Sequence, residues 1–282
     1  MTEWEKLKNI KLIIFDLDGT LLKNDGSIGK QTKRLINLLE EKNVKFSFAT
    51  GRLHSAIVDY AAELNITTPL ISLDGSYIKS YPDDAIVFES FIKERYVLKA
   101  LSLAQEFVIN IALCHADAIF FTEQNSLIPK ILYKFGAKYT EVPSYEGLTA
   151  NVLEIVFAGD NKRAISYIKD RLSFPFSFGI ENSFFRSQGL DNIFYLEIRR
   201  KGSSKGEGFL RLLKYLKINP YHSAVVGDWY NDLSLFETKA YKVALANAVP
   251  EIKRKANLIT KGTNDEEGIA EFLEIVLKSK SG

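Results

Sequence analysis

The chain has 282 residues, enough for a large core or for about two domains of ~150 residues each. Hydrophobic residues make up 46% and charged residues 26%, which is typical of a water-soluble globular protein. A net charge of +2 without a dense Lys/Arg run argues against a nucleic-acid partner. The N-terminus lacks a signal peptide's apolar core, and no apolar stretch reaches the about 20 residues that span a bilayer. We therefore expect a cytoplasmic protein without a membrane partner.

Three short apolar runs are each followed by polar residues: LIIF before Asp16, FSFA before Thr50, and AVV before Gly227 and Asp228. Such runs predict strands that are buried on both faces. Amphipathic helical spacing precedes the second and third runs, at residues 30–43 and 206–217. Alternating strands and helices predict an α/β fold with a parallel sheet, whose ligands bind beyond the carboxyl ends of the strands.

The middle of the chain differs from its two ends. Residues 88–197 predict helices at KERYVLKALSLAQEF, SLIPKILYKF and NKRAISYIKDRL, and short strands at INIALC, AIFFT, VLEIVFAG, FSFG, SFFRS and FYLEI. These elements suffice for an α+β unit of its own. We therefore expect a core domain in two parts, residues 1–87 and 198–282, with residues 88–197 inserted between them.

The sequence DLDGT places two aspartates, Asp16 and Asp18, at the end of the first apolar run. Carboxylates at the end of a buried strand are costly unless a cation or hydrogen bonds stabilise them. The alternative is a strand-end turn with two hydrated aspartates. The other polar segments favour a shared chemical site instead.

Two further segments carry groups that suit a phosphate. FATGR places the Thr50 hydroxyl beside Gly51 at the end of the second strand, and RRKGSSKGEGFL places Lys205 just before a helix. A lysine at the beginning of a helix can contact a phosphate, although a flexible connection is the alternative. The segment does not match the GxxxxGK[ST] loop of nucleoside triphosphatases.

The segment GDWYNDLSLF brings Asp228, Asn231 and Asp232 after the third strand. Carboxylates with a neutral amide suit Mg²⁺, and a polar helix N-terminus is the alternative. With Asp16 and Lys205, this set suits phosphoryl transfer through an aspartyl-phosphate. Two like charges ~4 Å apart repel by roughly 4 kcal/mol at an effective dielectric of about 20, so a carboxylate that attacks a phosphate needs a cation.

In this order, DLDGTLL, FATGR, KGSSKGEG and GDWYNDLSLF resemble the four motifs of the haloacid dehalogenase superfamily. The DxDGT form resembles its phosphatase branches, and the long insertion is similar to the α/β cap of the Cof-type (class II) sugar phosphatases. The resemblance implies a Rossmann-like, doubly wound parallel sheet with an inserted α+β cap domain. It also implies a Mg²⁺-dependent phosphatase, a phosphoric monoester hydrolase of small phosphorylated metabolites, sugar phosphates above all.

The same resemblance implies the catalytic and metal-binding residues. Asp16 would be the nucleophile that forms the aspartyl-phosphate, and Asp18 the general acid and base. Mg²⁺ would be held by the side chain of Asp16, the backbone carbonyl of Asp18 and the side chain of Asp228. Asn231 and Asp232 would support the ion directly or through other ligands.

The resemblance further implies a phosphate pocket. Thr50, Gly51 and Lys205 would bind the phosphoryl oxygens, and Asn247 in ALANAVPEIK would help to shape the pocket. One departure concerns specificity, because Asp74 in ISLDGSYI stands where such relatives usually have Asn. Its carboxylate would repel an anionic substrate or select one that bears an amine or hydroxyl; a hairpin turn residue is the alternative.

Two other functions fit parts of the pattern. A phosphomutase of similar fold would return the phosphoryl group to the substrate instead of to water. A receiver-like signalling domain also combines an acidic cluster with a hydroxyl and a lysine, but it would need no long insertion. We expect a monomer or a small homo-oligomer.

Overall fold

The computed structural model describes residues 2–125, 128–129, 138–186 and 192–281 of the chain. The chain forms two compact units. The core unit contains Met1–Gly51, Val58–Phe88 and Ser204–Gly282, and the cap unit contains Arg52–Ile57 and Glu89–Ser203. The boundaries expected for the inserted domain, residues 88 and 197, stay a prediction.

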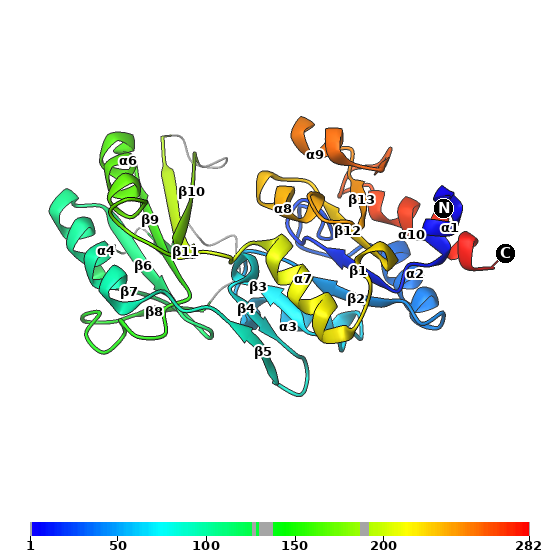
Figure 1. Cartoon of the computed structure of the whole chain (residues 1–282), viewed down its shortest axis with the longest axis horizontal. Helices are drawn as coiled ribbons and strands as arrows, with labels where there is room; N and C mark the ends of the chain where they lie inside the picture. The colour runs from blue at the N-terminus through cyan, green and yellow to red at the C-terminus, as the bar shows by residue number, and fades with distance from the viewer. Residues whose placement is uncertain (1, 126–127, 130–137, 187–191, 282) are drawn as a thin grey trace. The chain divides into compact units, whose positions relative to one another are not determined.

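The core unit is built on a five-stranded parallel sheet with the order β14-β13-β12-β1-β2 (Figure 1). The strands are β1 (Leu12–Phe15), β2 (Lys45–Phe48), β12 (Ser223–Gly227), β13 (Tyr241–Ala244) and β14 (Leu258–Ile259). Every residue of β1 and β12 is buried, as expected for strands that are covered on both faces. The predicted parallel α/β sheet is confirmed.

Amphipathic helices surround this sheet. They are α1 (Glu3–Lys8), α2 (Lys30–Glu40), α3 (Val58–Glu63), α7 (Lys205–Leu216), α8 (Leu233–Phe236), α9 (Pro250–Lys255) and α10 (Gly268–Ser281). Leu35, Ile36 and Leu39 form the buried stripe of α2, which packs against α10. Helices α7, α8 and α9 share an apolar cluster with the sheet. Within the described residues of both units, no helix is long and apolar enough to cross a membrane.

A small three-stranded sheet in the chain order β3-β4-β5 follows the FATGR segment. Its strands are β3 (Leu70–Ser72), β4 (Tyr77–Lys79) and β5 (Ile86–Glu89). Strands β3 and β4 are antiparallel, and Asp74 lies in the turn between them. This turn also contacts α7, which begins with Lys205.

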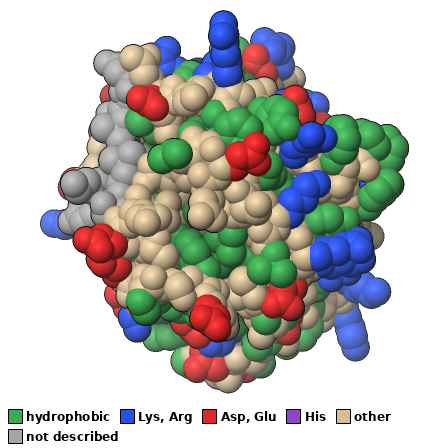
Figure 2. All heavy atoms as spheres, turned by 90° about the vertical axis from the view of Figure 1, so that its left-hand side faces the viewer, with side chains coloured by type: hydrophobic (Ala, Val, Ile, Leu, Met, Phe, Trp, Pro, Cys, Tyr) green, Lys and Arg blue, Asp and Glu red, His purple; other side chains and the backbone are tan. Residues whose placement is uncertain are grey.

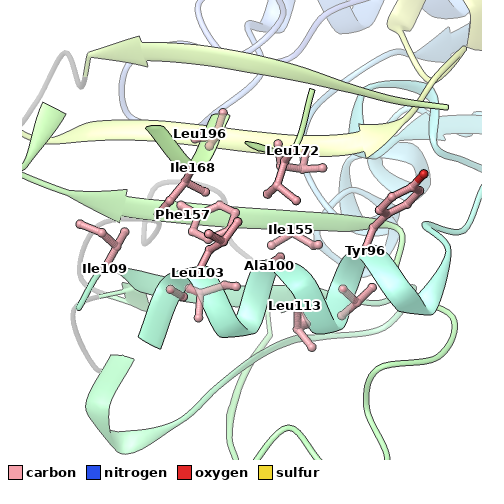
Figure 3. Close-up of a cluster of buried hydrophobic side chains, with 14 of the residues drawn as sticks. Tyr96, Ala100, Leu103, Ile109, Leu113, Ile155, Phe157, Ile168, Leu172 and Leu196 are labelled. Carbon is pink, nitrogen blue, oxygen red and sulfur yellow. The ribbon is translucent and has the colours of Figure 1, made fainter. Parts of the chain in front are cut away.

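The cap unit contains a six-stranded mixed sheet with the order β10-β11-β9-β6-β7-β8. Its elements are α4 (Glu94–Phe107), β6 (Asn110–Cys114), β7 (Ile119–Phe121), β8 (Tyr139–Glu141), β9 (Glu154–Gly159), α6 (Lys162–Arg171), β10 (Ile180–Arg186) and β11 (Phe194–Arg200). Figure 3 shows how Leu103 of α4 and Ile168 of α6 pack with Phe157 and Leu196 of the sheet. The expected α+β cap domain is therefore present with its own core.

One predicted strand of the cap unit is wrong. The FSFG segment before β10 forms a turn and bends, and its backbone bonds to side chains of α4: Lys99 Nζ donates to the carbonyl of Phe176 at 3.1 Å, and the N–H of Phe178 donates to the hydroxyl of Tyr96 at 2.9 Å. Phe174 and Phe178 are exposed. Figure 2 shows hydrophobic side chains beside Lys and Arg on the face that it presents. The helix predicted at SLIPKILYKF lies almost entirely outside the described residues.

Candidate active site

The carboxyl ends of three core strands bring distant polar residues to one edge of the sheet. Phe15 of β1 pairs with Phe48 of β2 and with Val226 of β12. Asp16 follows β1 and donates its backbone N–H to the carbonyl of Val226 at 3.0 Å. Because the three strands are parallel and in register, Asp16, Thr50 and Asp228 follow the strands at the same edge.

Lys205, at the first turn of α7, joins two of the predicted site residues. Its ammonium nitrogen lies 2.6 Å from Oδ1 of Asp16 and 2.7 Å from Oδ1 of Asp232, and its side chain is fully buried. Burial alone would lower the pKa of Lys205, but the carboxylates of Asp16, Asp232 and Asp74 raise it well above its usual value. Lys205 is therefore a fixed positive charge beside Asp16.

Three buried carboxylates share this positive charge. Asp16, Asp228 and Asp232 each offer a carboxylate oxygen, and these oxygens lie within 4.8 Å of one another. Burial raises the pKa of Asp16 well above its usual value; Lys205 opposes this shift, while Asp232 and Asp228 add to it. Burial and Asp232 likewise raise the pKa of Asp228 to about 7. The cluster therefore favours a further cation or a proton.

The loop after β12 is folded around Asp232. Its Oδ2 accepts hydrogen bonds from the backbone N–H groups of Asp228 and Trp229 at 2.9 and 3.1 Å. A Cβ atom on Gly227 would lie 2.5 Å from this same oxygen, so glycine is required there. Asp232 thus uses one oxygen for the loop and the other for Lys205, which makes it the link between β12 and α7.

The DLDGT segment turns directly over Asp228. Gly19 has a φ of +76°, and a Cβ atom on it would lie 2.6 Å from Oδ2 of Asp228. Thr20 donates its hydroxyl to Oδ1 of Asp228 at 2.6 Å. Asp18, which lies between Asp16 and Gly19 in the sequence, is exposed. Thr20 is not among the predicted site residues, although it stands in the same DLDGT motif as Asp16 and Asp18.

Asn247 holds the same turn from the other side. Its Nδ2 donates to the carbonyl of Gly19 at 2.7 Å, and its Oδ1 accepts from the backbone N–H of Asn264 at 3.0 Å. The side chain therefore stabilises the loop beside the carboxylate cluster. Its expected part in the phosphate pocket stays a prediction.

Thr50 and Gly51 continue the edge on the β2 side. The backbone of Thr50 donates to the carbonyl of Ile71 at 3.0 Å and accepts from the N–H of Asp74 at 2.9 Å. Asp74, 6% exposed, accepts a 3.3 Å hydrogen bond from Nδ2 of Asn231. The predicted residues on both sides of the cluster are thus connected through Asp74, whose role the sequence left open.

The doubly wound core with a cap domain defines the class of fold. A crystal structure of a haloacid dehalogenase-like hydrolase from Bacteroides thetaiotaomicron superposes with a TM-score of 0.82 at 25% identity, over 94% of this chain and 98% of that chain. The model of the family described as haloacid dehalogenase-like hydrolase matches residues 13–273. The chain belongs to this family.

Two similar proteins of Bacillus subtilis (strain 168) carry the names of phosphatases. Phosphatase YwpJ is 27% identical over 95% of this chain and 100% of its own length. The 5-amino-6-(5-phospho-D-ribitylamino)uracil phosphatase YitU is 24% identical over 93% of this chain and 96% of its own length. The predicted Cof-type hydrolase is confirmed, and the protein is a phosphatase.

Proposed function

We propose that this phosphatase uses Mg²⁺ and hydrolyses small phosphorylated metabolites, with sugar phosphates as the substrate class, through an aspartyl-phosphate on Asp16. The observation that carries the proposal is the buried carboxylate of Asp16 held 2.6 Å from the Lys205 ammonium, next to Asp228 and Asp232. This arrangement combines a nucleophile with positive charge at the place where a phosphoryl group would bind.

The donor set fits a hard divalent cation. It consists of carboxylates whose oxygens lie close enough to share one ion, and burial makes their uncompensated negative charge costly. We assign Mg²⁺ to the side chains of Asp16 and Asp228 and to the backbone carbonyl of Asp18, with Asn231 and Asp232 in support. When bound, Mg²⁺ neutralises charge on the phosphoryl oxygens.

In the proposed reaction the carboxylate of Asp16 attacks phosphorus. The bond between phosphorus and the ester oxygen breaks, and Asp18 donates a proton to the departing alcohol. Asp18 then takes a proton from a water molecule that attacks the phosphorus of the aspartyl-phosphate, which frees Asp16 and releases phosphate. The exposed position of Asp18 suits both proton transfers, since the alcohol and the water approach from solvent.

The phosphoryl oxygens are assigned to Lys205, Thr50 and Gly51, with Asn247 shaping the loop beside them. Lys205 begins α7, whose N-terminal amides favour an anion. The name of the relative YitU, whose substrate carries a phosphate on a ribityl chain, supports a phosphorylated polyol or sugar as substrate. The proposal includes a cytoplasmic location and no nucleic-acid or membrane partner.

The test is phosphate release from p-nitrophenyl phosphate and from a panel of sugar phosphates, each with Mg²⁺ and with EDTA. We expect activity that needs Mg²⁺ and falls by at least about 10³-fold in Asp16→Asn, which keeps the shape of the side chain. Equal activity of the two proteins would refute the role of Asp16. Transfer of phosphate between positions of one sugar, without release, would favour a phosphomutase.

A further inference from the structure

The turn that carries Asp74 has an unusual backbone. Leu73, Asp74 and Gly75 have consecutive φ values of +46°, +47° and +94°. The left-handed region costs a non-glycine residue about 1–2 kcal/mol, although an aspartate tolerates it better than a leucine. Such strain persists where the surroundings enforce it, and it concentrates at functional sites. A four-residue hairpin loop such as that between Ser72 and Tyr77 is most often built on a type I turn, which would not need three such residues in a row.

Contacts on two sides hold this turn in place. The N–H of Asp74 donates to the carbonyl of Thr50 at 2.9 Å. A Cβ atom on Gly75 would lie only 2.2 Å from the carbonyl oxygen of Ser204, so the turn packs closely against the beginning of α7. Asp74 is consequently fixed between the end of β2 and the beginning of α7. Burial of Lys205 lowers its pKa, and the charge of Asp74 is one of those that raise it.

The partner of Asp74 in the loop after β12 is Asn231. Nδ2 of Asn231 donates to Oδ1 of Asp74 at 3.3 Å. An ionised carboxylate only accepts hydrogen bonds, so Asn231 has to turn its NH₂ group toward Asp74. The carbonyl oxygen of the amide then points away from Asp74. An asparagine at position 74 would lift this restriction, because an amide offers both donors and an acceptor.

We propose that Asp74 is a positioning residue, which fixes the amide of Asn231 so that its carbonyl oxygen is offered to the hydrated Mg²⁺ ion. The inference rests on the proposed Mg²⁺ dependence. It gives the carboxylate at position 74 a role in the metal site, in place of repelling or selecting substrates. Asp74 acts through Asn231, and its effect on Mg²⁺ should therefore depend on Asn231 being present.

Isothermal titration calorimetry of the metal-free protein with Mg²⁺ tests this without an activity assay. The set is wild type, Asp74→Asn, Asn231→Ala and the double variant. Asparagine keeps the size of the side chain and accepts the left-handed backbone. We expect Asp74→Asn to weaken Mg²⁺ binding roughly three- to tenfold in the wild-type background, and less than about twofold when Asn231 is absent.

A matched control is Asp84→Asn, which removes an aspartate at φ +60° that pairs with Lys79 in the same small sheet. It should leave Mg²⁺ binding unchanged. If Asp74→Asn weakens Mg²⁺ binding by the same factor with and without Asn231, the effect comes from the charge of Asp74 alone. That result would overturn the inference. If wild type binds no Mg²⁺, the proposed metal dependence fails and the inference fails with it.

Discussion

The hydroxyl of Thr20 donates a 2.6 Å hydrogen bond to Oδ1 of Asp228, across 208 residues of sequence. Burial and Asp232 raise the pKa of Asp228 to about 7, and the bond from Thr20 acts against this shift. Thr20 therefore favours the ionised form of Asp228, which is the form that binds a cation.

The first prediction follows from this bond. Thr20→Val keeps the shape of the side chain but removes the hydroxyl. Because a hydrogen bond to a charged group contributes about 1.5–3 kcal/mol, we expect the Mg²⁺ concentration for half-maximal phosphatase activity to rise about tenfold or more. Thr260→Val, which removes a hydroxyl bonded to the carbonyl of Gly262 at 2.7 Å, is the control. An equal rise in both variants contradicts the prediction.

The second prediction concerns pH and Asp228. Its folded pKa of about 7 lies above the ordinary value of 3.8, so the folded protein retains a proton that the unfolded chain releases. The stability that this group contributes is present below about pH 4 and is lost as the pH rises through 7. Asp228→Asn stays neutral, so without metal it should be more stable than wild type by roughly 2–4 kcal/mol at about pH 8.

Urea unfolding in EDTA at several pH values measures this difference. The two proteins should converge as the pH falls below 3.8, where the wild-type carboxyl becomes protonated in the unfolded chain as well as in the folded protein. Addition of Mg²⁺ at about pH 8 should stabilise wild type more than the variant. A wild type that is the more stable protein in EDTA at about pH 8 would show that Asp228 is ionised there without cost.

Much of the core could be predicted from the sequence. LIIF and AVV are continuous apolar runs because β1 and β12 are covered on both faces, and that pattern is local. The order of the motifs then places Asp16, Lys205 and Asp232 at one sheet edge, and the structure joins their side chains.

The contacts that fix the geometry could not be predicted in this way. The bonds of Thr20 to Asp228 and of Asn247 to Gly19 join segments that are far apart in sequence. The left-handed turn at Asp74 is enforced by the end of β2 and by α7, since no local preference favours Leu73 at positive φ. The FSFG segment likewise bonds to distant side chains, since Phe176 and Phe178 use backbone groups for Lys99 and Tyr96 of α4.

The third prediction removes the buried ammonium. Lys205→Met has a similar length, but it leaves Asp16 and Asp232 buried without their partner. Loss of one partner of a buried ion pair costs about 3–5 kcal/mol, and we expect the free energy of unfolding at about pH 8 to fall by this amount. Phosphatase activity should be lost as well. The cost should shrink at lower pH, where the carboxylates take up protons. Lys214→Met, on the exposed side of α7, should change neither quantity.

The fourth prediction separates backbone strain from steric contact at Gly19. Gly19 and Gly147 have φ values of +76° and +77°, but a Cβ atom would meet Oδ2 of Asp228 at 2.6 Å in the first case and nothing within 4 Å in the second. Gly147→Ala should therefore lower the free energy of unfolding by about 1 kcal/mol, which is the cost of the left-handed backbone alone. Gly19→Ala should lose more and should also bind Mg²⁺ more weakly, because the new methyl group displaces the Asp228 carboxylate. Unfolding curves and Mg²⁺ titrations of both variants decide this: equal stability losses, with Mg²⁺ affinity unchanged in Gly19→Ala, would mean that the DLDGT turn does not hold Asp228 in place.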